Sequence, residues 1–275
     1  DAGTVISWIE KAGYAVAASW AGTFVRARYM GHTQFRHPVP VDRRAVPRRV
    51  PLPTAGHRRL RRAVGHRGGG RRRRCEHEGA ERADRAGFGA VQLHAAHGYL
   101  IHQFLSPLTN TRTDEYGGDF EGRTRFLKEV VAAVREVWPA DKVLGIRISG
   151  TDWVEGGWSI EETVRLAQEL QGQVHWFDLS SAGIGDTYEG PQGPGYQVPL
   201  ATAVKEGTEG IVVSAVGSLT GAEEVAAVVD EDRADAVCVG RAALANPHWP
   251  TAAALSLGVP ADQAPMARQY FRAKW

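Results

Sequence analysis

Short apolar runs alternate with helical stretches from about residue 85 onward, and this alternation constrains the fold most. Runs of strand length recur at 89–95, 143–149, 176–181, 210–217 and 236–241. Strands that alternate with helices form parallel sheets through right-handed crossovers. The pattern therefore predicts an α/β fold, either closed as a (β/α)8 TIM barrel or open as a doubly wound sheet.

The segments between these runs carry helix signals. Residues 120–137 place apolar side chains at three- and four-residue spacing, which gives a helix one apolar face. Ser159 with Glu162, and Thr220 with Glu223, have the spacing of a capping box. We therefore expect one helix over 120–137 and two more that begin at these pairs.

Polar residues at the carboxyl ends of the runs favour the barrel. These residues are His94, His97, Arg147, Ser149, Ser180, Ser181, Gly217, Gly240 and Arg241. Barrel enzymes build their active sites on this rim, with a phosphate site after the last two strands. A dinucleotide fold needs a glycine-rich turn opening a helix. The nearest candidate, Gly183 with Gly185, lacks the third glycine and is predicted to be an ordinary loop.

His94 and His97 are the sharpest local signal, because two imidazoles just past a strand can point at one acceptor atom. Zinc needs further ligands, and the neighbouring sequence supplies none, so we predict no metal. The pair could instead polarise a carbonyl or nitro oxygen by hydrogen bonding, or could be two structural histidines.

The two cysteines, Cys75 and Cys238, are far apart, which fits a reducing cytoplasm and no disulfide framework.

Residues 1–85 form an atypical, Arg-rich segment, distinct from a barrel portion at 86–275. Residues 1–87 hold 19 Lys and Arg against 7 Asp and Glu, whereas 88–275 hold 14 against 24. A nucleic-acid-binding arm, an inert disordered tail and a frame-shifted stretch of a GC-rich gene are all compatible with this composition. No aromatic residue lies between Phe35 and Phe88 to stack on bases, which disfavours nucleic acid.

The stretch HAAHGYLIHQFLSPLTNTRTDEYGGDFEGRTRFLKEV (94–130) resembles the Old Yellow Enzyme family of flavin-dependent reductases. The resemblance continues in register through GIRIS, DLSSAG, GPGYQVPLA, AVGSL and VGRAALANPHW to Trp275. It implies a TIM barrel that binds FMN, is reduced by NADPH, and reduces activated alkenes conjugated to carbonyl or nitro groups.

Site residues follow from the same resemblance. His94 and His97 match the pair that binds the activating oxygen of the substrate, and Tyr99 matches the proton donor to the substrate carbon. Arg147 matches the arginine beside the pyrimidine edge of the flavin. Gly217, Gly240 and Arg241 match the phosphate-binding positions. Arg272 matches a C-terminal arginine that enters a neighbouring subunit's site, which implies a homo-oligomer.

The first three strand–helix units of a barrel are not recognisable in the sequence, so we expect a barrel that is incomplete at its N-terminus. Two other functions therefore stay open. One is a nucleic-acid-binding protein on an inactive barrel remnant, and the other is a barrel that binds another phosphorylated ligand.

No run of eighteen apolar residues is present, and the N-terminus lacks a signal-peptide layout, so we expect no membrane span and a cytoplasmic location.

Overall fold

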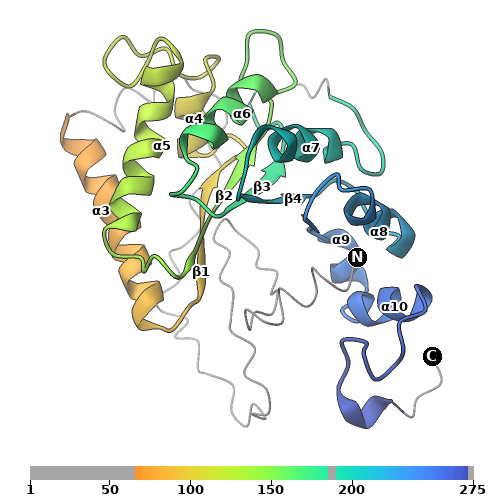
Figure 1. Cartoon of the computed structure of the whole chain (residues 1–275). Helices are drawn as coiled ribbons and strands as arrows, with labels where there is room; N and C mark the ends of the chain where they lie inside the picture. The colour runs from red at the N-terminus through yellow and green to blue at the C-terminus, as the bar shows by residue number, and fades with distance from the viewer. Residues whose placement is uncertain (1–65, 185–189, 272–275) are drawn as a thin grey trace.

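A computed structural model describes residues 66–184 and 190–271, in which strands and helices alternate (Figure 1). The strands are β1 (Ala90–Ala95), β2 (Val143–Ser149), β3 (Trp176–Ser180), β4 (Val212–Ala215) and β5 (Ala236–Val237). The helices are α3 (His66–Arg85), α4 (Leu100–Leu105), α5 (Phe120–Arg135), α6 (Ile160–Glu169), α7 (Val198–Gly207), α8 (Ala222–Asp230), α9 (Arg241–Ala245), α10 (Trp249–Ser256) and the 3-10 turn Arg268–Tyr270.

The described strands form one parallel sheet in the order β1-β2-β3-β4-β5. A doubly wound sheet changes direction at a switch point, where strands that are not consecutive become neighbours. This sheet has no such point and follows chain order, as a (β/α)8 barrel does. The observed topology therefore selects the barrel from the two closures that the sequence left open.

One row of side chains across the sheet builds the core, and we call it the outer row. Its members pair in register across four strands and are all buried: Leu93, Ile146, Phe177 and Val213. They pack in one apolar cluster with the face of α5 that includes Leu127 and Val130. Burying such side chains contributes about 1.5–3 kcal/mol each to folding. The apolar periodicity predicted at 120–137 is thus the contact between α5 and the sheet.

Helix α6 begins as predicted. The Ser159 hydroxyl accepts a hydrogen bond from the Glu162 N–H, and the Glu162 carboxylate accepts one from the Ser159 N–H, both at 3.3 Å. This reciprocal pair satisfies two backbone donors that the helix itself leaves unpaired. The capping box predicted for α6 is therefore confirmed.

The capping box predicted at Thr220 and Glu223 is wrong by one residue. Helix α8 starts after Gly221, and the Glu224 carboxylate accepts from the N–H groups of Thr220 and Gly221 at 3.4 and 3.2 Å. The cap position is therefore Gly221, which has no side chain, and the carboxylate that reaches back is that of Glu224 rather than Glu223.

Helix α3 lies inside the segment that the sequence analysis set apart as 1–85. It packs against α5, and Ala80 in its second half is buried. Asp84 forms an ion pair with Lys142 at 2.6 Å. The end of that segment thus belongs to the barrel wall, whereas residues 1–65 lie outside the described part of the chain.

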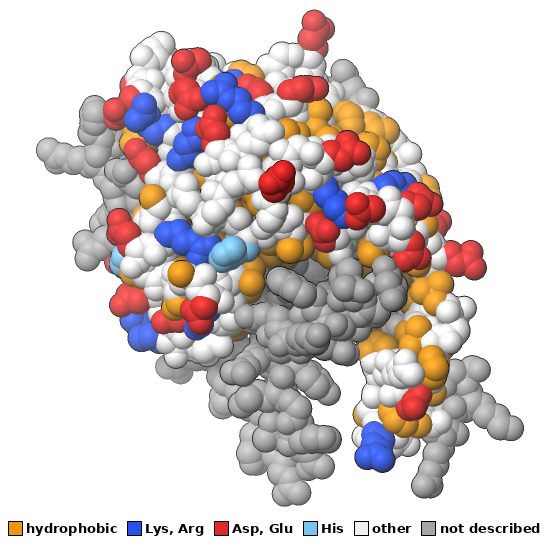
Figure 2. Space-filling model, in the orientation of Figure 1, with side chains coloured by type: hydrophobic (Ala, Val, Ile, Leu, Met, Phe, Trp, Pro, Cys, Tyr) orange, Lys and Arg blue, Asp and Glu red, His pale blue; other side chains and the backbone are white. Residues whose placement is uncertain are grey.

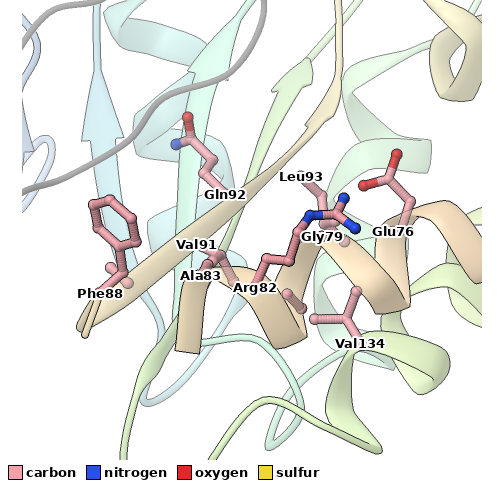
Figure 3. A pocket seen from close by; sticks show the side chains of 11 residues that line it. Glu76, Gly79, Arg82, Ala83, Phe88, Val91, Gln92, Leu93 and Val134 are labelled. Carbon is pink, nitrogen blue, oxygen red and sulfur yellow. The ribbon is translucent and has the colours of Figure 1, made fainter. Parts of the chain in front are cut away.

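A cavity of about 290 Å³ separates α3 from β1 (Figure 3). Small residues of the helix, Gly79, Ala80 and Ala83, face the first half of the strand there, where Val91 and Leu93 also line the space. A helix with small side chains cannot fill the gap to a sheet, so a void remains. The lining on β1 extends only to Leu93, and the polar residues predicted for the site do not line the cavity.

Acidic and basic side chains mix on the surface shown in Figure 2. On α5 and α6, Glu121 contacts both Lys128 and Arg165, and Glu169 contacts the same two cations. Such alternation produces no extended field of one sign. Across the described ranges, no helix combines the length and hydropathy that crossing a membrane requires.

Candidate functional site

The turn after β1 has an unusual backbone. His97 and Gly98 both adopt left-handed conformations, with φ of 56° and 71°. A left-handed histidine is uncommon and costs free energy, so the surrounding structure must hold it. Tyr99 follows directly and precedes α4. The turn therefore places His94, His97 and Tyr99 within six residues of one another at the carboxyl end of β1.

A second loop packs against this turn and requires glycine on both sides. A Cβ on Gly98 would lie 2.2 Å from the Gly183 carbonyl oxygen, and a Cβ on Gly183 would lie 2.3 Å from the His97 Cα. No other residue fits either position without moving the backbone. Gly183 was predicted to sit in an ordinary loop. Its loop instead packs directly on the turn that carries the histidines.

The three aromatic side chains of the turn cluster. The ring centroids of His94 and His97 are 5.4 Å apart in an edge-on arrangement, and those of His94 and Tyr99 are 4.8 Å apart. Tyr99 is half exposed. The sequence analysis predicted that these residues share one site, and the structure brings them together.

Both histidines are neutral at physiological pH. Burial, followed by the Arg147 guanidinium, lowers the pKa of His94 to about 4 and that of His97 to about 3. A neutral imidazole carries one N–H donor and one acceptor nitrogen. His97 Nε2 lies 2.6 Å from Ser180 Oγ, whereas the buried Nδ1 of His94 has no hydrogen-bond partner among the described residues. The hydrogen-bonding capacity of His94 is therefore not used up by contacts within the described residues.

A second row of side chains lies one residue further along the same strands, and we call it the inner row. Its members are polar and pair in register from β1 to β4: His94, Arg147, Asp178 and Ser214. Neighbours in register on parallel strands point to the same side of the sheet. The inner row thus joins the histidine turn to the middle of the sheet.

The middle of the inner row is a buried ion pair. Arg147 Nε lies 3.5 Å from Asp178 Oδ2, and the Ser214 hydroxyl donates to Asp178 Oδ1 at 3.0 Å. Burial raises the pKa of Asp178, and the Arg147 charge opposes that rise. Cys238 Sγ lies 3.6 Å from Asp178 Oδ1, so Cys238 borders this polar row.

A cavity of about 230 Å³ adjoins the inner row. The four residues predicted to bind the cofactor all line it: Arg147, Gly217, Gly240 and Arg241. Arg241 donates to the Ser218 hydroxyl at 2.7 Å. No acceptor among the described residues pairs with the amide N–H groups of Gly217, Ser218 or Gly240. Unpaired amides beside a guanidinium suit an anion such as phosphate.

These observations fit FMN. The amide groups without acceptors and the Arg241 side chain line the cavity together, where a phosphate would bind. Arg147, a member of the inner row, also lines the cavity and supplies a cation there. A flavin ring that gains negative charge on reduction needs such a cation. Arg272 lies outside the described residues.

Sequence reasoning missed two groups that support the site. Gln197 connects two strand ends, since its Oε1 accepts from the Ser181 hydroxyl at 2.6 Å and its Nε2 donates to the Val216 carbonyl at 3.0 Å. His102 and Asp152 are both buried beneath the histidine turn. No spacing signal links residues about 50 positions apart, although a third histidine in HAAHGYLIH could have drawn attention.

Comparison with known proteins decides the class. The sequence profile of the NADH:flavin oxidoreductase / NADH oxidase family matches residues 77–258, about two thirds of the chain. The chain belongs to this family. Membership confirms the predicted class of protein, an FMN-dependent oxidoreductase family that uses NADPH or NADH, and the resemblance to Old Yellow Enzyme.

Individual relatives agree. An NADPH dehydrogenase of Geobacillus thermodenitrificans is 46% identical over 187 residues, covering 66% of this chain and 53% of the relative. That of Halalkalibacterium halodurans is 43% identical over 181 residues, covering 66% and 52%. A solved structure of morphinone reductase is 30% identical with a TM-score of 0.57, covering 77% of this chain and 54% of that one. The chain spans about half the length of these relatives.

Proposed function

We propose that this chain forms the FMN- and substrate-binding part of an ene-reductase. It would take hydride from NADPH and reduce the C=C bond of α,β-unsaturated carbonyl or nitro compounds. The inner row carries this proposal, because His94 on the substrate side pairs in register with Arg147, which lines the cofactor cavity. A substrate that binds the histidine turn would therefore lie next to the cofactor.

The cofactor would be held by the cavity's own donors. The amides of Gly217 and Gly240 and the guanidinium of Arg241 would bind the phosphate, and Arg147 would face the ring. When bound, FMN supplies hydride transfer between NADPH and the alkene. Asp178 would keep Arg147 oriented toward the ring through their ion pair.

The histidine turn would supply the rest of the chemistry. As neutral imidazoles, His94 and His97 would each donate one N–H to the carbonyl or nitro oxygen and withdraw electrons from the alkene. Tyr99, whose ring packs on His94, would donate its hydroxyl proton to the carbon next to the activating group. Ser180 would hold the ring of His97 in orientation.

The test is alkene-dependent oxidation of NADPH by the full chain saturated with FMN under anaerobic conditions. With 2-cyclohexenone present, we expect NADPH consumption, followed by its absorbance, and cyclohexanone as product. His94→Ala with His97→Ala should lower the rate by on the order of 10²–10³-fold, and Tyr99→Phe by about 10²-fold or more. His77→Ala, on α3, is the control. Unchanged rates in the site variants would contradict the proposal.

Other features of the family resemblance are part of the same proposal. Arg272 would reach the site of a neighbouring copy, so we expect a dimer or larger assembly by light scattering. Deleting residues 272–275 should reduce the fraction of chains in this assembly.

A cytoplasmic location is proposed from the low cysteine content. The nucleic-acid alternative rests on the part of the Arg-rich segment where the arginines concentrate, Arg36 to Arg74. If that alternative were right, deleting residues 36–74 would abolish salt-sensitive binding to heparin.

A further inference from the structure

A third histidine, His102, lies on α4 beneath the histidine turn and is completely buried. Each of its ring nitrogens has a neighbour. The Gly98 N–H donates to Nδ1 at 2.9 Å, and Nε2 lies 2.9 Å from Asp152 Oδ1 in an off-axis approach. Because Nδ1 accepts a hydrogen bond, the ring proton is on Nε2, next to the carboxylate.

Asp152 is fixed at the other end of this contact. Its Oδ2 accepts hydrogen bonds from the Ser106 hydroxyl at 2.6 Å and the Trp158 N–H at 2.8 Å. Burial raises the pKa of Asp152, but its contacts with His102, Ser106 and Trp158 outweigh burial, and the pKa is lowered. The carboxylate is therefore charged, and two hydrogen bonds hold it beside the ring of His102.

The turn is held at both of its peptide groups from α4. His102 accepts from the N–H of Gly98, while the Gln103 amide donates to the Gly98 carbonyl at 2.6 Å. Gly98 follows the left-handed His97, whose backbone costs on the order of 1–3 kcal/mol to hold. These two hydrogen bonds offset that cost and fix the direction in which the chain leaves β1.

We propose that Asp152 and His102 are positioning residues for the reaction. Through the Gly98 amide they hold the turn that presents His97 and Tyr99 to the substrate. This inference rests on the proposed function for its catalytic meaning. The same contacts also make a prediction about the protein without cofactor or substrate, so the two can be tested apart.

Two substitutions of His102 separate its contacts. In His102→Asn, the amide oxygen takes the place of Nδ1 and can still accept from Gly98, but the contact with Asp152 is lost. In His102→Gln, the amide nitrogen takes the place of Nε2 and can still reach Asp152, but nothing accepts from Gly98. A histidine that only fills space would make both variants equally defective, so their difference isolates the Gly98 hydrogen bond.

The first measurement uses the protein without cofactor. Amide hydrogen exchange of Gly98, followed by NMR, should accelerate at least about tenfold in His102→Gln, which loses the acceptor of this amide, and only about threefold in His102→Asn, which keeps an acceptor but loses its contact with Asp152. Asp152→Asn, nearly the same shape, should give an intermediate rate. Equal exchange in wild type and His102→Gln would overturn the proposal.

The second measurement uses the FMN-loaded chain and 4-hydroxybenzaldehyde, a phenol that should bind the histidine pair and perturb the flavin spectrum. We expect its Kd to rise about tenfold in His102→Gln and only about threefold in His102→Asn, at similar melting temperatures. Equal losses in both variants would overturn the positioning role. If the wild type binds no phenol, the proposed function fails, and Gly98 exchange alone decides this inference.

Discussion

The outer row and the inner row are one residue apart on the same four strands, yet they differ completely in chemistry. The outer row is apolar, faces the helices and stabilises the fold by burial. The inner row is polar, and its members depend on one another: Arg147 offsets the burial of Asp178, and Ser214 donates to the same carboxylate. A strand alternates its faces with a period of two, so one sheet holds both rows. Substitutions in the two rows should therefore fail in different ways.

The largest effect is expected in the outer row. Ile146→Ala removes a completely buried side chain and should lower the free energy of unfolding by about 2–5 kcal/mol, independent of pH. Urea unfolding followed by circular dichroism measures this change. Ile146→Val, which removes one methylene group, is the matched control at about 0.5–1.5 kcal/mol. A cost below about 0.5 kcal/mol for alanine, the range of neutral surface substitutions, would show that this row is not a packed core.

In the inner row the effect should be smaller and should depend on pH. Arg147→Met leaves Asp178 buried without its cation, which costs about 2–3 kcal/mol near neutral pH. The folded-state pKa of Asp178 is already raised, and the substitution raises it further. A raised carboxyl pKa means that stability declines as pH rises through it. The variant should thus be less stable at about pH 8 than at about pH 5.

The double variant Arg147→Met with Asp178→Asn is the control for this slope. It removes the carboxyl group that titrates, so its stability should lack the decline between about pH 5 and about pH 8 that Asp178 causes in Arg147→Met. If the stability of Arg147→Met did not depend on pH, Arg147 would not be the cation that offsets the buried charge of Asp178.

Features formed by residues close together in the sequence were predictable, and features formed by distant residues were not. The strands were predictable within about two residues because each is a short apolar run with turn residues around it, although β5 is reduced to Ala236–Val237. The close grouping of His94, His97 and Tyr99 followed from proximity in one motif. These are local properties, which a linear pattern records.

Contacts between distant segments were not predictable. The approach of Gly183 to Gly98 and the pairing of His102 with Asp152 depend on strand register, which no local pattern states. The predicted start of α8 was wrong because Thr220 and Glu223 match the sequence pattern of a capping box, whereas Gly221 at the observed cap position has no side chain that a pattern could detect. Helix α3 was missed because its Arg-rich first half hides the apolar face of its second half.

A third prediction concerns His97, which lies in the turn after β1, next to the inner row. Its pKa is about 3 in the folded protein and about 6.5 in an unfolded chain. Because the unfolded state binds the proton first, stability falls as pH drops from about 6.5 toward 3, at about 1 kcal/mol per pH unit. His97→Asn should flatten this part of the profile in urea unfolding, and the exposed His248→Asn should not. An unchanged slope in His97→Asn would mean that the ring is solvated.

The smallest effect tests the helix starts. Ser159→Ala removes the hydroxyl that caps α6 and should cost about 1 kcal/mol. Thr220→Ala should cost less than about 0.5 kcal/mol, because the Glu224 carboxylate rather than the Thr220 hydroxyl serves α8. Thermal melting of both variants distinguishes them, and equal losses would restore the capping box at Thr220.

The central claim is that the inner row and its cavity hold FMN, and a titration of the purified chain with FMN tests it most directly. We predict stoichiometric binding, seen as quenched flavin fluorescence, with bleaching by NADPH under anaerobic conditions. Arg241→Gln should weaken binding by about tenfold through loss of a phosphate contact, while Arg165→Gln on the outer surface should leave it unchanged. A chain that folds but leaves the flavin fully fluorescent, or that loses binding equally in both arginine variants, would contradict the account.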